Sequence, residues 1–312
     1  MFEIRRYEAT MRDKWDTYVR RARNATFLFE RSYMEYHADR FEDHSLMFFK
    51  GARLYALMPA HRTGTTFTSH FGLTYGGLVM DMGVTITETC ELFTELNEYL
   101  RCQGFTRVLY RPVPWIYHTV PAEEDLYAIF WHCGARLHLR NIGTTICLQQ
   151  HLRWRKDHLR RLRKSHAGGV SVKSHADLSE FWPVLTENLR KRFDASPVHR
   201  LDEIQQLQRN FPDNIIQYSA YRNGRIIGGI TFYISRHVVH GQYSATNDEG
   251  KEYGAMEAIY ERVIYNDYSN YTYLDFGSST EEQGSVINRG LIAHKEGYAG
   301  RGVVYDTYEW EL

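Results

Sequence analysis

The sequence predicts a mixed α/β protein made of two similar units of about 150 residues each. Three observations predict it. Helix and strand patterns alternate along the 312 residues, the same order of elements occurs in each half, and a basic run separates the halves. Corresponding positions keep similar spacings: Gly51 and Gly224 in two hairpin turns lie 173 residues apart, and Gly134 and Gly297 at two helix ends lie 163 apart. With 43% hydrophobic residues, the chain can bury a core in each unit.

The first half begins with helical patterns. Trp15, Tyr18 and Val19 have helical spacing, which predicts a helix over 12–22, and a short helix follows over 31–39. A hairpin is expected over 45–60, and strand and loop over 66–81. A helix is expected from Thr87, its candidate N-cap, to the stop at Gly104. A strand over 105–114, a helix that ends at Gly134 and a strand over 144–150 complete this half.

The second half repeats the order after a basic helix over 151–166 and a break at Gly168 and Gly169. Helices are expected over 178–193 and 200–211, and a hairpin over 215–234 turns at the Asn223–Gly224 pair. A strand over 237–248, a helix over 252–267, a strand over 271–279, a helix over 281–297 and a final strand follow. The predicted domains are therefore 1–150 and 170–312, joined by a basic helical linker over 151–169.

Composition excludes several classes of protein. Lysine and arginine number 38, as do aspartate and glutamate, so no overall charge favours nucleic acid or a membrane surface. No apolar signal-peptide core and no run of about 18 apolar residues is present. The cysteines show no C-x-x-C spacing and lie in apolar patterns, which predicts buried free thiols in a reducing compartment: Cys90, Cys102, Cys133 and Cys147. We therefore expect a cytoplasmic protein without a membrane span.

Several stretches carry a family resemblance: "LYALMPA" with "SHFGLTYGGL", "PVH" followed by "EIQQL", "DFGSST" and "NRGLIAHKEGYAGR". In this order they resemble the Fem family of peptidoglycan-precursor aminoacyltransferases and its relatives among envelope and polysaccharide genes. The resemblance covers nearly the whole chain. It implies two tandem GNAT-like (Gcn5-related N-acetyltransferase) domains, with mixed sheets flanked by helices. It also implies that the second domain is catalytic and that the first contributes the acceptor groove.

Acyl transfer to an amine requires a proton to leave the amine and negative charge to be stabilised on the carbonyl oxygen. By resemblance to the Fem pattern K-x-x-F-G, Lys295 of "KEGYAG" is the lysine beside that oxygen, with Tyr298 in place of phenylalanine. Asp275 ends a strand and is a candidate acceptor for the amine proton. Both residues have structural alternatives: a solvated lysine at a helix C-terminus, and a carboxylate that caps the turn with Ser278 and Ser279.

Other candidates for substrate binding are polar or aromatic residues near predicted loops, strand ends or the last helix: Ser69, His70, Tyr75, His199, Tyr243, Asn247, Ser278, Asn288 and Tyr298. The glycines of "SHFGLTYGG" would let the backbone approach a ligand. Structural alternatives remain for these residues. Ser69 and His70 suit a loop hydrogen bond, Tyr243 suits the core, and Asn288 suits the surface of the last helix.

The basic run supplies the candidates for phosphate binding. From His151 to His166 it holds seven lysines and arginines and one acid. Arg160, Arg161 and Lys164 could hold a CoA diphosphate, a UDP-linked sugar peptide or the acceptor end of a tRNA, or they could form a solvated face. The turn "NDEGKEYGAMEA" has Gly250 and Gly254 but lacks the Q/R-x-x-G-x-G/A spacing usual for acyl-CoA sites.

Two functions follow from these features. The first is an N-acyltransferase that moves an acyl or aminoacyl group to an amine on a cell-envelope precursor. Its co-substrate would be acyl-CoA or aminoacyl-tRNA, and its acceptor a UDP-linked muropeptide or an amino sugar. The second is a binding protein made of a degenerate GNAT pair. We expect no metal, because neither His37 with His44 nor His237 with His240 completes a ligand set.

Overall fold

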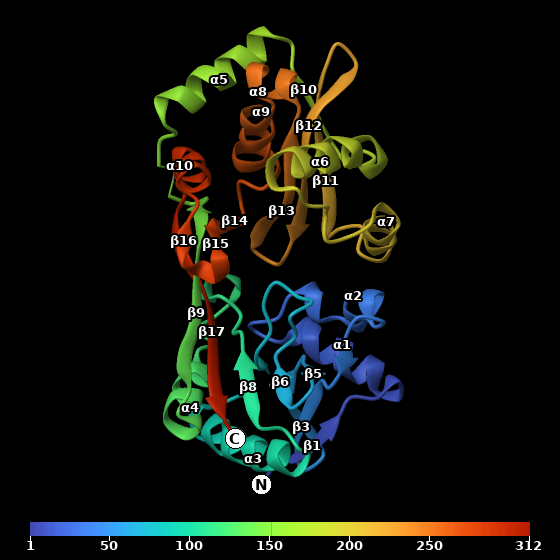
Figure 1. The fold of residues 1–312 in the computed structure, drawn as a ribbon, viewed down its shortest axis with the longest axis vertical. Helices are drawn as coiled ribbons and strands as arrows, with labels where there is room; N and C mark the ends of the chain where they lie inside the picture. The colour runs from blue at the N-terminus through green and yellow to red at the C-terminus, as the bar shows by residue number, and fades with distance from the viewer. Residues whose placement is uncertain (151) are drawn as a thin grey trace. The chain divides into compact units, whose positions relative to one another are not determined.

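The computed structural model describes residues 1–150 and 152–312, so His151 at the start of the predicted basic helix lies outside the described residues, and for Phe193 only the backbone is described. The chain forms two compact units (Figure 1). Unit 1 contains 1–141, 282–286 and 304–312, and unit 2 contains 142–281 and 287–303. These bounds differ from the predicted ranges, because the second half of the strand before the basic helix belongs to unit 2 and the last strand ends in unit 1.

Unit 1 has a small sheet ordered β1-β3-β4-β7 and a second set of strands ordered β17-β8-β6-β5-β2. Its helices are α1 (Arg12–Arg21), α2 (Arg31–Met34), α3 (Ile86–Cys102) and α4 (Glu124–Cys133). Its strands are β1 (Glu3–Arg6), β2 (Glu42–Asp43), β3 (Leu46–Lys50), β4 (Arg53–Met58), β5 (His61–Thr63), β6 (Thr66–Thr68), β7 (Val79–Met80) and β8 (Arg107–Tyr110). Strands β9 (Arg136–Cys147) and β17 (Arg301–Glu311) run through both units.

Two helix ends in unit 1 test the sequence-based expectations. Helix α4 ends at Gly134, whose φ of 62° is left-handed, and this confirms the predicted stop. Helix α3 begins at Ile86, and its N-cap is Thr85 with extended backbone, so the predicted start at Thr87 is wrong. The alternating threonines Thr85, Thr87 and Thr89 all suit a cap, which explains the error of two residues.

Unit 2 has a mixed sheet ordered β10-β11-β12-β13-β14-β9, and the short strands β15 and β16 pair only with each other. Helix α9 packs on β11 and β12, and α6 packs on β12 and β13 (Figure 1). The strands are β10 (Ser171–Ser174), β11 (Ile215–Arg222), β12 (Arg225–Ile234), β13 (Val238–Thr246), β14 (Tyr273–Ser278), β15 (Thr280–Glu281) and β16 (Val286–Ile287). The helices are α5 (Lys156–Ala167), α6 (Leu178–Phe193), α7 (Leu201–Asn210), α8 (Asp248–Tyr253), α9 (Ala255–Arg262) and α10 (Arg289–Gly297).

Two predicted helices of unit 2 differ from the prediction. The helix expected over 252–267 does reach Asp267, through a π-helix over Val263–Asp267, but Gly254, whose φ is 70°, divides it into α8 and α9. The helix expected over 281–297 begins only at Arg289. Glu282, Gln283 and Gly284 have φ of 47°, 55° and 91°, and three left-handed residues in a row cannot continue an α-helix. Asn288 is therefore the N-cap of α10, not an interior residue.

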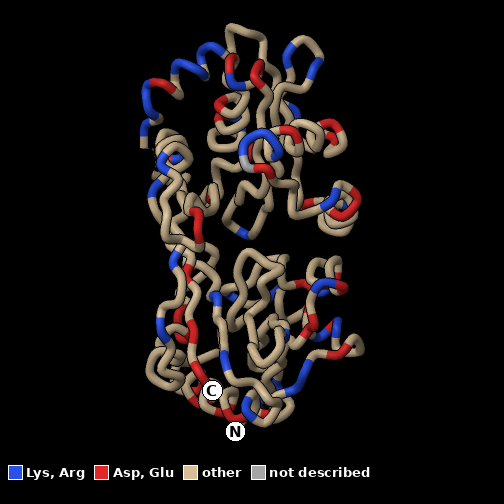
Figure 2. The backbone as a smooth tube through the Cα atoms, in the orientation of Figure 1, with Lys and Arg blue, Asp and Glu red and all other residues tan. Residues whose placement is uncertain are grey.

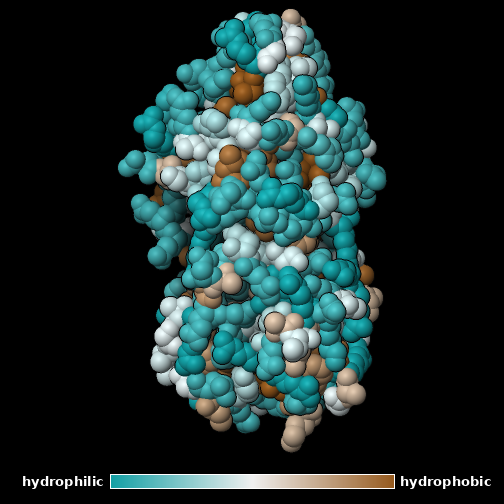
Figure 3. Space-filling model, turned by 90° about the vertical axis from the view of Figure 1, so that its right-hand side faces the viewer, coloured by the Kyte–Doolittle hydropathy of each residue, from teal (hydrophilic) through white to brown (hydrophobic). Residues whose placement is uncertain are grey.

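Each unit has its own apolar core. In unit 1, side chains of α3 such as Phe93 and Leu96 pack with Trp310 of β17, and in unit 2 Ile259 and Tyr260 of α9 pack with Phe232. Apolar residues therefore appear only as small separate groups on the face seen in Figure 3. The four cysteines have free thiols, but Cys102 is exposed and the others are half-buried, so the prediction of buried thiols is wrong. Cys102 is the last residue of α3.

We predict that Trp310 anchors the end of β17 in unit 1. Its indole Nε1 donates to Oδ1 of Asn97 at 3.0 Å. Trp310→Phe leaves this buried oxygen without its donor, and the free energy of unfolding measured in urea should fall by about 1–3 kcal/mol. Trp131, which is 66% exposed, is the matched control, and Trp131→Phe should change the free energy by less than about 0.5 kcal/mol. Equal effects of the two substitutions would contradict this anchoring role.

Candidate active site

The sheet of unit 2 opens between β13 and β14. The two strands pair in parallel at only three positions, Val238 with Tyr273, Val239 with Leu274 and His240 with Asp275. The next residues, Gly241 and Phe276, line a cavity of about 750 Å³. The strands therefore separate directly after the His240–Asp275 pair, and among the described residues no strand pairs with β13 along the edge that faces the cavity.

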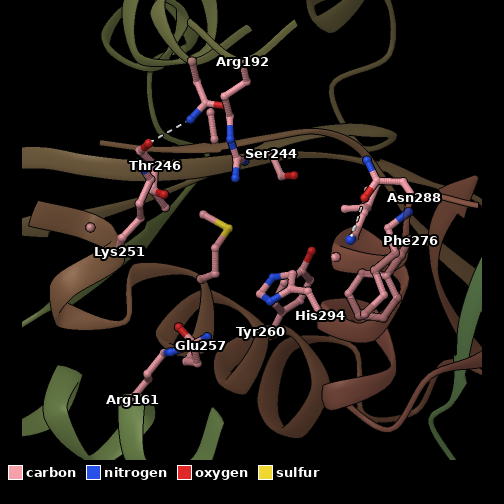
Figure 4. A pocket seen from close by; sticks show the side chains of 18 residues that line it. Arg161, Arg192, Ser244, Thr246, Lys251, Glu257, Tyr260, Phe276, Asn288 and His294 are labelled. Atoms are coloured by element: carbon pink, nitrogen blue, oxygen red, sulfur yellow. Dashed lines mark hydrogen bonds and ion pairs between the residues drawn. The ribbon is translucent and has the colours of Figure 1, made fainter. Parts of the chain in front are cut away.

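All walls of the cavity come from unit 2 (Figure 4). The β13 wall consists of Gly241, Ser244, Ala245 and Thr246. The helical walls include Arg161 of α5, Asn188 and Arg192 of α6, Gly250 and Lys251 of α8, and Met256, Glu257 and Tyr260 of α9. Phe276 of β14, with Asn288, Gly290, Leu291, His294 and Lys295 of the α10 segment, closes the remaining side. Aromatic and cationic side chains thus line the same cavity.

Lys295 lies on this last wall and is only 6% exposed. Its ammonium donates to the backbone oxygens of Gly277 at 2.9 Å and Ser278 at 2.7 Å. Burial lowers the pKa of Lys295 to about 8, while the charge of Asp275 acts in the opposite direction. At pH 7 the side chain is therefore mostly protonated. An ammonium has three N–H donors, so these two bonds leave one for a ligand.

Asp275 is fully buried and does not line the cavity. Its Oδ1 accepts hydrogen bonds from Thr145 Oγ1 at 3.1 Å and from the Gly277 amide at 3.0 Å. Its Oδ2 lies 2.8 Å from Nδ1 of His240. This burial does not suit direct proton transfer from a substrate amine, which was the expected role of Asp275. The carboxylate instead orients His240.

The end of the cavity nearest α5 is built on a buried ionic group. Oε1 of Glu257 lies 2.9 Å from Nδ1 of His158 and 3.3 Å from Nη1 of Arg161. Burial raises the pKa of Glu257, but the His158 hydrogen bond and the Arg161 charge outweigh it and lower the pKa. Burial, with His158 nearby, lowers the pKa of His294 to about 4, so that ring is neutral at pH 7.

The predicted phosphate-binding residues lie on α5, along which lysine and arginine positions are frequent in Figure 2. Only Arg161 reaches the cavity. Arg160 is exposed, and Lys164 pairs with Glu252 at 3.2 Å and lies over the ring of Tyr253. The sequence reasoning missed two other cations of the cavity, Arg192 and Lys251, because they lie on α6 and α8, outside the basic run.

The structure brings three of the predicted site residues together at the cavity, namely Lys295, Asn288 and Arg161. Asn288 has a structural role as well, since its Oδ1 accepts from the Leu291 amide at 2.9 Å and caps α10. Asn247 caps α8 through a 2.8 Å bond from the Gly250 amide. Tyr298 is fully buried in the core. The Ser278 hydroxyl lies 2.8 Å from that of Thr280.

Two further predicted residues of unit 2 contact each other away from the cavity. The Tyr243 hydroxyl lies 2.5 Å from Nδ1 of His199, and both side chains are buried. The ring of Tyr243 packs against Trp182 of α6. Neither residue lines the cavity of unit 2, so the expected substrate contacts are replaced by a packing role.

The three predicted residues of unit 1 are buried side chains. Ser69 Oγ accepts from the Arg111 amide at 2.7 Å, and the Tyr75 hydroxyl donates to Thr26 Oγ1 at 3.1 Å. Burial lowers the pKa of His70 to about 3, so its ring is neutral at pH 7. The expected alternative, a hydrogen bond between Ser69 and His70, is wrong for these described residues: Ser69 bonds to the Arg111 amide, and the His70 amide donates to the Thr68 oxygen.

His240 is the most informative residue that the sequence reasoning missed. In the sequence it suggests only a metal ligand, whereas the structure pairs it with Asp275 on a neighbouring strand. In the described parts of the chain, no cluster of three or more His, Cys, Asp or Glu side chains could hold a metal ion. No helix in those parts has the length and apolar character needed to cross a membrane.

Part of unit 2 matches a known protein family. Residues 150–283, which are less than half of the chain, match the family model described as an acetyltransferase (GNAT) domain. This segment contains β13, α9 and β14, and it makes the second unit an acyltransferase domain. No curated protein matches the sequence.

Solved structures extend the likeness to the whole chain. The crystal structure of FemX has a TM-score of 0.69 at 9% identity, and the match covers 99% of this chain and 97% of that chain. The structure of L-PGS from Bacillus licheniformis has a TM-score of 0.61 at 11% identity, with 96% and 91% covered. A tandem GNAT protein from the clavulanic acid biosynthesis pathway has a TM-score of 0.56 at 10% identity, with 100% and 98% covered. At these identities the likeness establishes the fold, and the predicted tandem GNAT fold is confirmed.

The lowered pKa of Lys295 predicts a pH dependence of stability. Between about pH 8 and about pH 10.4, the ordinary lysine value, the unfolded chain keeps this proton while the folded chain has lost it. The free energy of unfolding should therefore rise with pH in this window, by about 3 kcal/mol in total from this residue.

Urea denaturation from pH 7.5 to 10.5 measures this effect. Lys295→Met should remove that part of the rise. Exposed Lys173→Met is the control and should keep it. Parallel curves for wild type and Lys295→Met would contradict the prediction.

Proposed function

We propose that this chain is an N-acyltransferase that moves an acyl group from a thioester or ester donor to an amine on a cell-envelope precursor. The observation that supports it most is the placement of Lys295 on the cavity where β13 and β14 separate. A substrate carbonyl at this point would meet a buried ammonium with a remaining N–H donor. The backbone carbonyls of Gly277 and Ser278 fix that ammonium before any substrate arrives.

Electrostatic stabilisation of the carbonyl oxygen is the proposed role of Lys295. Negative charge develops on this oxygen when the amine attacks, and a preorganised donor stabilises that charge most where water is excluded. Removing one such donor in other enzymes lowers kcat by about 10²–10³. The reaction needs no covalent intermediate on the enzyme, because positioning and charge stabilisation suffice.

The cavity has the parts that an acyl-CoA donor needs. Arg161, Arg192 and Lys251 supply positive charge for a diphosphate. Among the described residues Arg192 forms no ion pair, whereas Arg161 and Lys251 have carboxylate partners. Beyond His240, the edge of β13 that faces the cavity offers backbone groups to an amide-bearing chain, in the manner of an added strand.

The charges in the cavity favour a simple acyl group over an aminoacyl group. An aminoacyl donor carries an ammonium near its ester, and a carboxylate is the natural partner for it. Glu257 is the acidic residue among the described cavity-lining side chains, and it already pairs with His158 and Arg161. We therefore place acyl-CoA ahead of aminoacyl-tRNA as the donor. For a tRNA, the exposed face of α5 with Arg160 and Lys164 would be the contact.

An amine on a UDP-linked muropeptide or an amino sugar is the proposed acceptor. Its support is the resemblance to the Fem family and the structural likeness to FemX over nearly the whole chain. Calorimetric titration with UDP-linked muropeptides tests the envelope assignment separately from the acyltransferase chemistry. Binding of the muropeptide together with failure to bind acetyl-CoA would instead favour an aminoacyl-tRNA donor.

We predict that Lys295→Ala lowers kcat by about 10²–10³ in an assay with acetyl-CoA and a UDP-linked muropeptide amine. Acetyl-CoA binding, measured by calorimetry, should be largely retained, because the missing interaction forms with the charged transition state. Lys173→Ala removes an exposed lysine outside the cavity and should leave both quantities unchanged.

The same pair of variants separates an enzyme from a binding module. A binding module would show ligand binding, no measurable transfer by the wild type, and no change of binding in Lys295→Ala. An unchanged kcat in Lys295→Ala, with transfer intact, would remove Lys295 from the mechanism.

A further inference from the structure

The His240–Asp275 pair lies where the sheet of unit 2 divides. It is the last of the three pairs that join β13 to β14, and the residues that follow on both strands line the cavity. Any acyl group that reaches the gap between the strands therefore comes next to this pair. The position is set by the backbone register, not by a flexible side chain.

The pair lies on the sheet face opposite the α9 core. Leu274 and Phe276 belong to the apolar cluster that includes side chains of α9, and Asp275 between them must point to the other face. Thr145 alternates with Ile146 on β9 in the same way and donates to Asp275. The cavity is not confined to the α9 face, because Asn188 and Arg192 of α6 line it together with residues of α9.

Lys295 and His240 approach the same short segment of β14. The lysine donates to the Gly277 oxygen, and a Cβ added to Gly277 would lie 3.2 Å from Cε1 of His240. Gly277 also has a φ of 67°, which favours glycine. Lys295 and His240 therefore both approach Gly277, Lys295 as part of the cavity wall and His240 from just outside the cavity lining.

Asp275 determines which nitrogen of His240 is basic. A fully buried carboxylate 2.8 Å from Nδ1 favours the proton on Nδ1. In the neutral ring Nε2 is then the nitrogen with the lone pair. Thr145 and the Gly277 amide hold the carboxylate itself in place.

We infer that His240 Nε2 accepts the proton of the attacking amine, with Asp275 as the positioning residue. The amine nitrogen bonds to the acyl carbon, the carbon–sulfur bond of the thioester breaks, and the amine proton moves to Nε2. His240 then returns the proton to the leaving thiolate or to solvent, so no further reactant is needed. This role rests on the proposed acyltransferase function.

The tautomer of His240 can be measured without any substrate. Protein labelled with ¹⁵N-histidine is examined by long-range ¹H–¹⁵N correlation at pH 8, and His240→Gln identifies the signal by its loss. We expect a protonated Nδ1 and an unprotonated Nε2. Asp275→Asn should reduce the population of that tautomer. A proton found on Nε2 in the wild type would overturn the inference.

Kinetics test the proton transfer itself. With acetyl-CoA and the same amine as above, His240→Ala should lower kcat by about 10²–10⁴ and leave the KM for acetyl-CoA nearly unchanged. Added imidazole should restore part of the rate, which a purely structural defect would not allow. His237→Ala, a histidine just before β13, is the control and should retain the wild-type kcat.

The outcomes separate the two claims. If Lys295→Ala impairs transfer but His240→Ala does not, or imidazole fails to restore the rate, the role of His240 is refuted and the acyltransferase function remains. If the wild type transfers no acyl group, the proposed function itself fails, and the role of His240 fails with it.

Discussion

The early end of the pairing between β13 and β14 is the constraint on which the rest of the site depends. Three residue pairs join the strands, and beyond them one edge of β13 and the face of Phe276 turn toward the cavity. A fully paired sheet would have used these backbone groups for its own ladder. The unpaired edge of β13 instead lines the cavity, and α10 places Lys295 against the carbonyls of Gly277 and Ser278.

Buried charge around this opening is balanced locally. Asp275, Lys295 and Glu257 are each nearly or fully buried, and each has hydrogen-bond partners in the same unit. An isolated buried charge would be costly, and such groups are usually paired. The Lys295 ammonium differs, because two of its three N–H groups bond to the Gly277 and Ser278 oxygens and the third remains for a ligand. Burial of this incompletely bonded ammonium lowers the stability of the folded chain, as expected of a site prepared for a charged transition state.

Local sequence signals predicted much of the fold. The Asn223–Gly224 turn and the stop at Gly134 were predicted from the conformational preferences of glycine and asparagine, and both have left-handed backbones in the structure. The start of α10 was missed because the break at Glu282 and Gln283 involves residues that usually favour a helix. The sequence did not predict that β9 and β17 each run through both units, because this depends on contacts between residues far apart in the chain.

The candidate site was less predictable for the same reason. Lys295 was identified by the resemblance of "KEGYAG" to a family pattern, and Arg161 by the density of basic residues. The partnership of His240 with Asp275 joins residues 35 positions apart, and Thr145 lies 130 positions from Asp275. No short motif encodes such a register. Ser69 and Tyr75 were predicted to bind substrate because their side chains are polar, but in the folded chain they form hydrogen bonds inside unit 1.

The most direct test of the central claim, that the opening in unit 2 holds the acyl donor, is hydrogen–deuterium exchange with and without saturating acetyl-CoA. The account predicts slower amide exchange in the β13 segment 241–246 and in α9, where the donor would cover backbone groups now open to water. Unit 1 should remain nearly unchanged in the same experiment. Protection confined to unit 1, or no protection at β13, would contradict the assignment of this cavity as the donor site.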